Sequence, residues 1–146
     1  MYRHPHSATC HTPGVGPQDM NLPFSVLPER FAIARLAPTA QVPIDVLDAT
    51  GFVSISRTAD ELSIVCTEAL ADRFPQVDRG WRVIKIHGPF AFDQVGILAS
   101  LLTPLAAASI GIFAISTFDT DYILVKSENL DRAVGALGSI GYQQVG

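Results

Sequence analysis

The stretch IFAISTFDTDYILVKSE, residues 112–128, aligns without a gap on the earlier stretch FVSISRTADELSIVCTE, residues 52–68. In this alignment Ile55 matches Ile115 and Ser56 matches Ser116. Each stretch holds two runs of alternating apolar and polar residues joined by a short polar link, a pattern typical of a β-hairpin. Self-similarity within one chain indicates a repeated structural unit. The sequence therefore predicts two related units in tandem.

Segments around the two hairpins extend each unit. FAIARL (31–36) and WRVIKIH (81–87) predict one strand ahead of each hairpin. In the second unit, apolar residues at helical spacing predict helices over residues 96–108 and 130–141. A last strand is predicted over residues 142–145. The resulting order of strand, helix, strand, strand, helix, strand is that of the ferredoxin-like fold.

The first unit is shorter than the second. Pro38 and Pro43 interrupt the segment between its first two strands and leave room for about one helical turn, near residues 45–48. The predicted fold class is α+β: two tandem ferredoxin-like units, the first truncated, with antiparallel sheets that carry helices on one face. The predicted division is a flexible tail over 1–21, a truncated unit over 22–79 and a complete unit over 80–146.

Composition excludes several classes of function. The chain has 146 residues, 48% of them hydrophobic and 16% charged, with a net charge of −4. The hydrophobic content is ample for a core, and the low charge predicts surface buried against a partner. Without a concentrated basic patch, nucleic-acid binding is not expected. Two cysteines, Cys10 and Cys66, make no disulfide framework, and we expect a cytoplasmic location.

Residues 94–118 carry no charge and are long enough to span a bilayer. Pro104 lies in the middle of this run, and Gly111 follows an apparent helix end. We therefore interpret the run as a helix followed by a buried strand.

Soft metal ligands are concentrated in the tail. His4, His6, Cys10 and His11 lie close enough in sequence to hold zinc or copper. Nothing nearby would fix their geometry, so we interpret the segment as a tail without a metal site.

The longest distinctive string is GPFAFDQVGILASLLTPLAAASIGIFAISTFDTDYILV, residues 88–125. It resembles the ACT domains of small bacterial tandem-ACT proteins, and residues 52–68 resemble their truncated first ACT unit. The same family includes the regulatory segments of aspartokinases and the cytosolic arginine sensors of animals. The resemblance implies an allosteric module that binds a small molecule, usually an amino acid, at an interface between ACT domains.

The resemblance also implies where a ligand would bind. The turn before the first helix of the second unit corresponds to Ala91, Asp93, Gln94, Val95 and Gly96. The motif STF-x-x-D corresponds to Thr117, Phe118, Thr120 and Asp121. The opening of the second strand of that unit, Gly111 and Ile112, is expected to approach from a neighbouring ACT domain.

The chemistry of these residues suits an amino acid. Val95, Gly96 and Ile97 open a helix, and the free N–H groups of its first turn favour an α-carboxylate. Asp121 is suited to pair with an ammonium or guanidinium group, and Phe118 offers a ring to an aliphatic chain or a cation.

Structural roles compete with these binding roles. Asp93 is a candidate helix N-cap, Asp119 and Thr120 suit a tight turn, and Phe118 is a candidate core residue. We interpret His87 and Cys66 as packing residues. Gln94 stands where the arginine sensors carry an acidic residue, so the identity of the amino acid stays open.

The leading hypothesis is a non-catalytic amino-acid sensor that acts as a homodimer and regulates an enzyme in another chain. The chain has one full ACT unit, so the second unit of the site is expected from another copy. One alternative is a dimerisation or interaction module with a vestigial pocket. A less favoured alternative is a small ferredoxin-like enzyme, but the folded part has no catalytic residues that we identify, and we expect no cofactor.

Overall fold

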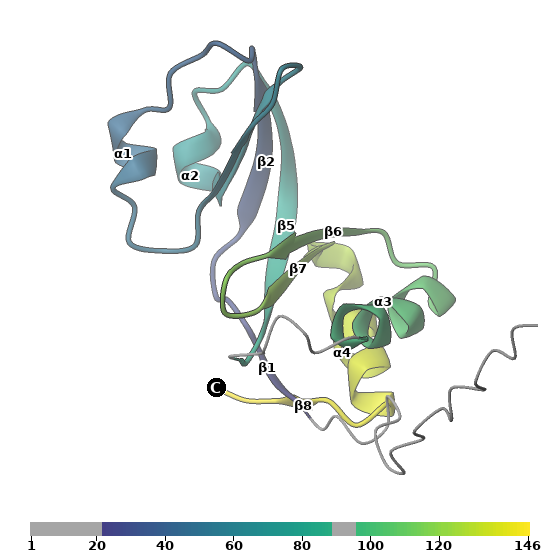
Figure 1. Cartoon of the computed structure of the whole chain (residues 1–146). Helices are drawn as coiled ribbons and strands as arrows, with labels where there is room; N and C mark the ends of the chain where they lie inside the picture. Colours follow the sequence, from purple (N-terminus) through teal and green to yellow (C-terminus); the bar gives the residue numbers. More distant parts are fainter. Residues whose placement is uncertain (1–21, 89–95) are drawn as a thin grey trace, which may run out of the picture.

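The computed structural model describes residues 22–88 and 96–146 as a chain of short strands and helices (Figure 1). The strands are β1 (Pro23–Val26), β2 (Phe31–Leu36), β3 (Ser54–Arg57), β4 (Leu62–Thr67), β5 (Gln76–Ile86), β6 (Ile112–Ser116), β7 (Asp121–Lys126) and β8 (Gln143–Gln144). The helices are α1 (Ile44–Leu47), α2 (Glu68–Ala71), α3 (Ile97–Ala107) and α4 (Leu130–Ser139), with a 3-10 turn η2 (Ser127–Asn129) before α4.

One long strand, β5, belongs to both units. Its first part, Gln76 to Asp78, pairs with β2, Trp81 pairs with both β2 and β7, and Arg82 to Lys85 continue the pairing with β7. The change of partners occurs around Gly80, which has φ +80°, a conformation that favours glycine. The Glu68 carboxylate accepts a hydrogen bond from the Gly80 N–H at 2.9 Å and so fixes this bend. This sharing explains why β5 begins earlier than the strand predicted over 81–87.

The strand order identifies the two units. The first unit has the order β3-β4-β2-β5, and the second joins β6, β7, β5, β1 and β8. All pairs are antiparallel except β1 with β8. Strand β1 was not predicted, and the sequence division placed its residues in the first unit. It pairs with β5 and β8 because Phe24, 1% exposed, belongs to the core beneath α3 and α4.

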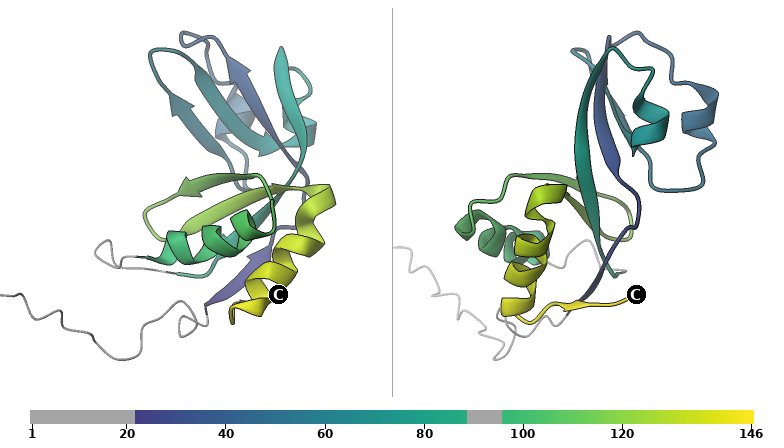
Figure 2. Two further views of the ribbon diagram at one scale, coloured as in Figure 1. Left: turned by 90° about the vertical axis from the view of Figure 1, so that its right-hand side faces the viewer. Right: turned by 180° about the vertical axis from the view of Figure 1, so that it is seen from behind.

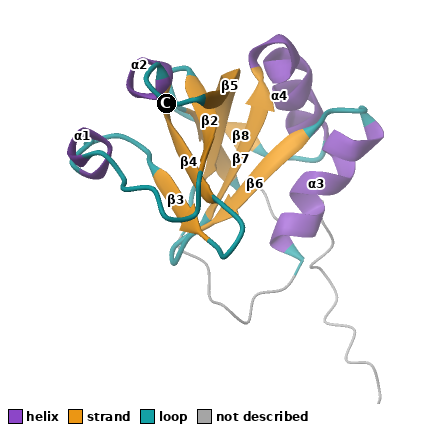
Figure 3. Ribbon diagram, turned by 90° about the horizontal axis from the view of Figure 1, so that it is seen from above, coloured by secondary structure: helices purple, strands orange, loops and turns teal. Residues whose placement is uncertain are grey.

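The helices cover opposite sides of the molecule. Figure 2 shows α1 and α2 on one side of the strands and α3 and α4 on the other, and Figure 3 shows the same layers from above. Each helical layer encloses its own core: Ile64 and Cys66 lie beneath α1 and α2, and Ile84 and Leu101 lie beneath α3 and α4. Each unit therefore carries its helices on one face of its sheet, as predicted.

The helix-free faces of the two units pack against each other and form a third core. Its fully or nearly fully buried members are Phe31, Val65, Val83 and Leu124. At its edge, the rings of Phe52 and Tyr122 lie 4.4 Å apart between centroids, and each comes from a different unit. Both faces of the central strands are consequently buried.

Both predicted hairpins are confirmed, and so is the helix-plus-strand interpretation of residues 94–118 over their described part, 96–118. Within the described ranges 22–88 and 96–146, no helix is long and apolar enough to cross a membrane.

The alignment of the two repeats is wrong by one residue. It matched Thr58 with Phe118, but the structure matches Thr58 with Thr117: the Thr58 N–H donates to the Glu61 carbonyl, and the Thr117 N–H donates to the Thr120 carbonyl, each at 2.8 Å. A slip of one residue moves every side chain to the other face of a sheet. The correct register makes Thr120 the counterpart of Glu61.

Candidate functional site

The turn between β6 and β7 is held by its own hydroxyl groups. The Thr117 hydroxyl donates to the Thr120 carbonyl at 3.0 Å, and the Thr120 hydroxyl donates to the carbonyl of Ile86 at the end of β5. Thr120 is 6% exposed. The structure therefore uses Thr120 to fasten the turn to β5, which is a structural role.

Asp121 opens β7 next to this turn. Its carboxylate accepts a hydrogen bond from the Ser116 hydroxyl at 2.6 Å, across the first pair of the hairpin. Asp121 is half-buried and alternates along β7 with Tyr122. Because Ile123 belongs to the core beneath α3 and α4, Asp121 lies on that same helical side.

Phe118 projects from the tip of the turn and is 79% exposed. The alternative that Phe118 is a core residue is therefore wrong. A ring held at this exposure is accessible to a ligand or to a second protein surface.

The start of α3 is where backbone N–H groups are expected to bind a carboxylate. Gly96 is the N-cap residue and has φ +86°, so this position favours glycine for its conformation alone. Ile97 is buried in the core beneath α3 and α4 and anchors the first turn of the helix. The predicted residues Ala91, Asp93, Gln94 and Val95 lie outside the described residues.

Gly111 and Ile112 lie at the opposite end of the hairpin from the turn. Ile112 pairs with Val125, whereas the turn is closed by the pair Ser116 and Asp121. The structure therefore does not bring Gly111 and Ile112 together with Thr117 and Asp121 within one chain. That Gly111 and Ile112 serve the site of a neighbouring copy stays a prediction.

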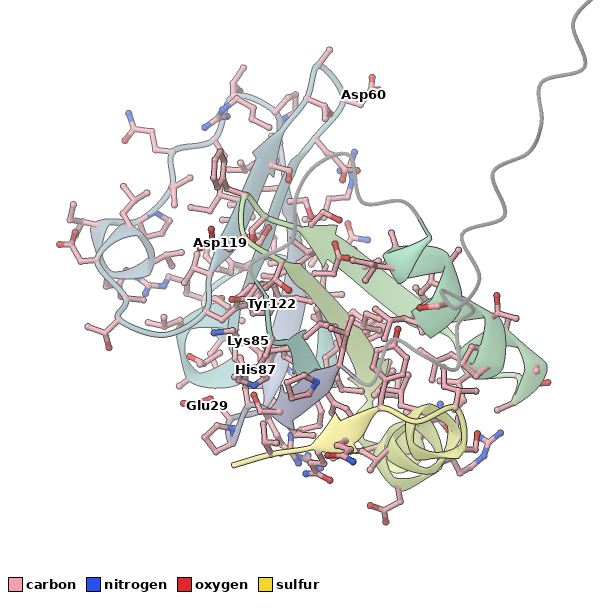
Figure 4. All side chains as sticks on the ribbon, turned by 60° about the horizontal axis from the view of Figure 1, so that its bottom comes forward. Glu29, Asp60, Lys85, His87, Asp119 and Tyr122 are labelled. Carbon is pink, nitrogen blue, oxygen red and sulfur yellow. The ribbon has the colours of Figure 1, made fainter. Side chains whose placement is uncertain are left out.

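A cavity of about 220 Å³ opens beside the turn. Residues from two strands and the turn line it: Lys85, His87, Gly88, Thr117, Asp119, Thr120 and Tyr122. Figure 4 shows the labelled side chains of Asp119, Tyr122, Lys85 and His87 following one another. His87 is half-buried and its Nε2 lies 2.9 Å from the Ser25 hydroxyl, so it both packs and lines the cavity.

Sequence reasoning missed Lys85 and Tyr122 as cavity residues. The available signal was a charged residue inside the otherwise apolar run RVIKI, where a half-buried lysine needs either solvent or a partner.

Among the remaining titratable candidates, the described one, Cys66, has a structural role. Cys66 is fully buried, as the packing interpretation requires, and burial raises the pKa of its thiol. In the part of the chain that the structure describes, no group of three or more His, Cys, Asp or Glu side chains could hold a metal ion. His4, His6, Cys10 and His11 lie outside that part.

Comparison with known proteins identifies the family. A family model of the ACT domain matches residues 76–139, and a model of a separate N-terminal domain matches residues 29–76. The human protein named cytosolic arginine sensor for mTORC1 subunit 1 is 41% identical over 58 residues, 39% of this chain. The match spans 18% of that sensor, so this chain covers less than a fifth of its length.

Solved structures agree with this assignment. Protein Atu0741 from Agobacterium tumefaciens is 42% identical, with a TM-score of 0.78, over 85% of this chain and 92% of its own. The regulatory subunit of aspartate kinase from Thermus thermophilus has the same fold, with a TM-score of 0.55 and 11% identity over 80% of this chain and 95% of its own. With its two units, its strand order and these matches, the chain belongs to the ACT domain family.

Proposed function

We propose that the protein is a non-catalytic regulatory protein that binds a free amino acid at the interface between ACT domains of a homodimer. The observation that carries the proposal is the turn that begins at Thr117 and ends at Asp121. The Thr120 hydroxyl bonds this turn to the end of β5, and the half-buried Asp121 presents its carboxylate beside it. A relative that matches 39% of this chain is named an arginine sensor, which supports an amino acid as the ligand.

In this proposal the two charged groups of the amino acid meet different elements. The α-carboxylate binds N–H groups at the start of α3, around Gly96 and Ile97, where the helix dipole favours an anion. The ammonium or a cationic side chain pairs with Asp121, and Phe118 covers the pair from water. Ala91, Asp93, Gln94 and Val95 complete this wall by the family resemblance.

The second wall comes from another copy. Gly111 and Ile112 lie too far along β6 to reach their own Asp121, and β6 pairs only with β7 among the described strands. A two-fold contact between copies would bring the Gly111 end of one subunit to the Asp121 end of the other. The protein would act in the cytoplasm on an enzyme or other target in a separate chain, as a ligand-dependent partner.

Calorimetry with each free amino acid tests the proposal. At least one should bind, and Asp121→Asn should weaken it about tenfold or more, because a charge-assisted hydrogen bond contributes roughly 1.5–3 kcal/mol. Asparagine can still accept the Ser116 hydrogen bond, so the fold should persist. Asp131→Asn, an exposed carboxylate on α4, is the matched control and should bind normally.

If no amino acid binds while the protein remains a dimer, the proposal fails and an interaction module with a vestigial pocket is favoured. If Asp121→Asn binds as tightly as the parent, Asp121 is not the partner of the cation.

A further inference from the structure

Lys85 occupies an unusual place for a charged residue. It lies on β5 between Tyr122 of β7 and Ser25 of β1, in the middle of the sheet of the second unit. Its side chain is half-buried on the helix-free face, where the next residue on the same face, Val83, is fully buried. The ammonium therefore lies at the edge of the apolar layer between the two units.

In the first unit, the cation at the position equivalent to Lys85 has a protein counter-charge. Arg35 of β2 corresponds to Lys85 of β5, because each follows, at the same spacing, an aromatic residue (Phe31 or Trp81) that pairs with the second strand of its own hairpin. The Arg35 Nε lies 3.4 Å from the Glu61 carboxylate, and the Arg35 guanidinium donates to the Asp60 carbonyl at 3.1 Å. The turn of the first hairpin thus supplies its own counter-charge.

The second hairpin lacks that counter-charge. The counterpart of Glu61 is Thr120, a neutral residue whose hydroxyl is already bonded to Ile86. Asp119 lines the same cavity as Lys85 but forms no ion pair with it. Across residues 22–88 and 96–146, no hydrogen bond or ion pair joins the Lys85 ammonium to protein, so it is open to solvent or to an added anion.

Two hollows meet at Lys85. The cavity beside the turn, about 220 Å³, shares Lys85, Thr117 and Tyr122 with a neighbouring hollow of about 420 Å³. The second hollow is bounded on its other side by Leu27, Gly51, Phe52 and Val53, which belong to the loop before β2 and the loop before β3. We call the joined space the inter-unit groove. The Lys85 ammonium of the groove belongs to the second unit, and the apolar wall that includes Phe52 belongs to the first unit.

We propose that the inter-unit groove is a second ligand site, which binds a small monocarboxylate with a flat apolar body. The carboxylate pairs with the Lys85 ammonium, and the body lies against the rings of Phe52 and Tyr122, whose centroids are 4.4 Å apart. Asp119 at the rim of the groove would repel a second carboxylate, so the ligand is expected to carry a single carboxylate group.

This site shares Thr117 with the amino-acid site proposed above, but the charged groups that would bind the ligand are different. Lys85 and Tyr122 lie on the helix-free face of the sheet, whereas Asp121 and the start of α3 lie on the helical side. The groove needs only one copy of the chain, because both of its walls belong to the same molecule. A ligand here would tie the two units together and raise the stability of the folded chain by mass action.

Benzoate tests the proposal, because it has the carboxylate and the flat ring but no ammonium group. Calorimetry should detect benzoate binding, and neutral benzamide should bind at least about tenfold more weakly. Lys85→Gln should weaken benzoate about tenfold or more. Arg35→Gln, which removes the equivalent but ion-paired cation of the first unit, should leave benzoate binding within about twofold.

A second measurement works on the unaltered protein. The chain has two lysines, Lys85 and Lys126, and Lys126 is ion-paired with Asp78 and lies 4.7 Å from the Trp81 ring centroid. An amine-reactive reagent followed by peptide mass spectrometry reports on each lysine separately. Saturating benzoate should slow modification of Lys85 several-fold and leave Lys126 unchanged.

Three results would overturn the proposal: no benzoate binding at about 20 mM, equal binding of benzoate and benzamide, or no protection of Lys85. Each would mean that the lysine stem merely covers apolar surface while its ammonium stays in water. Asp121→Asn should retain benzoate binding, so failure of the amino-acid site and failure of the inter-unit groove are distinguishable.

Discussion

Replacing Phe24 by alanine tests whether β1 is an integral part of the second unit. Phe24 is 1% exposed, pairs across to Ile86 of β5 and packs among Leu101, Leu137 and Tyr142. A phenylalanine truncated to alanine in such a core costs roughly 3–5 kcal/mol, from lost burial and the cavity that remains. Against a total of roughly 5–15 kcal/mol for a domain, this is a large fraction.

Phe118→Ala is the matched control, since the same atoms are removed from a residue that is 79% exposed. Urea unfolding followed by circular dichroism gives both free energies of unfolding. Phe24→Ala should lower the midpoint strongly with an unchanged slope, and Phe118→Ala should lose less than about 1 kcal/mol. A loss below about 1 kcal/mol for Phe24→Ala would refute the placement of β1 between β5 and β8.

Three further predictions concern individual groups. Thr120→Val should cost about 1–3 kcal/mol in urea unfolding, because it leaves the Ile86 carbonyl without its buried donor, whereas Thr117→Val at the exposed surface should cost less. Cys66, buried and with a raised pKa, should resist iodoacetamide at pH 8 in a Cys10→Ser background and react only after urea unfolding; rapid alkylation of the folded protein would contradict its burial. The hydrogen bond from Arg73 lowers the pKa of the Asp45 carboxyl, so the stability that this pair provides is present above the unfolded pKa and is lost as the pH falls through the lower folded pKa. Asp45→Asn should therefore flatten the decline of the free energy of unfolding in urea between pH 5 and about pH 2. An unchanged decline would show that the pair contributes nothing to stability.

Much of the fold could be predicted from the sequence, because the hairpins and the helices α3 and α4 have strong local patterns. The register of the repeat could not. Along β4, Ile64 faces the helices and Val65 faces the other unit, and both are buried. When both faces of a strand are buried, a shift of one residue leaves an equally apolar pattern, so alternation does not reveal which side a residue faces.

Strand β1 and the inter-unit groove escaped prediction for a related reason. The four residues of β1 have no local period, and they gain stability only from Ile86 and the helices far along the chain. The groove joins Lys85 to Phe52, residues of different units that the sequence gives no reason to place together. The turn of Thr117 to Asp121 could be predicted as a hairpin turn because the local motif is strong there, and its role in binding stays a prediction.

The central claim is that an amino acid binds between two copies of this chain. Sedimentation velocity across a range of micromolar concentrations, with and without the amino acid found by calorimetry, tests it most directly. The 15.7 kDa chain should sediment as a species of twice that mass, and the amino acid should lower the dissociation constant of this dimer. A monomer at every concentration, unchanged by any amino acid, would contradict the account.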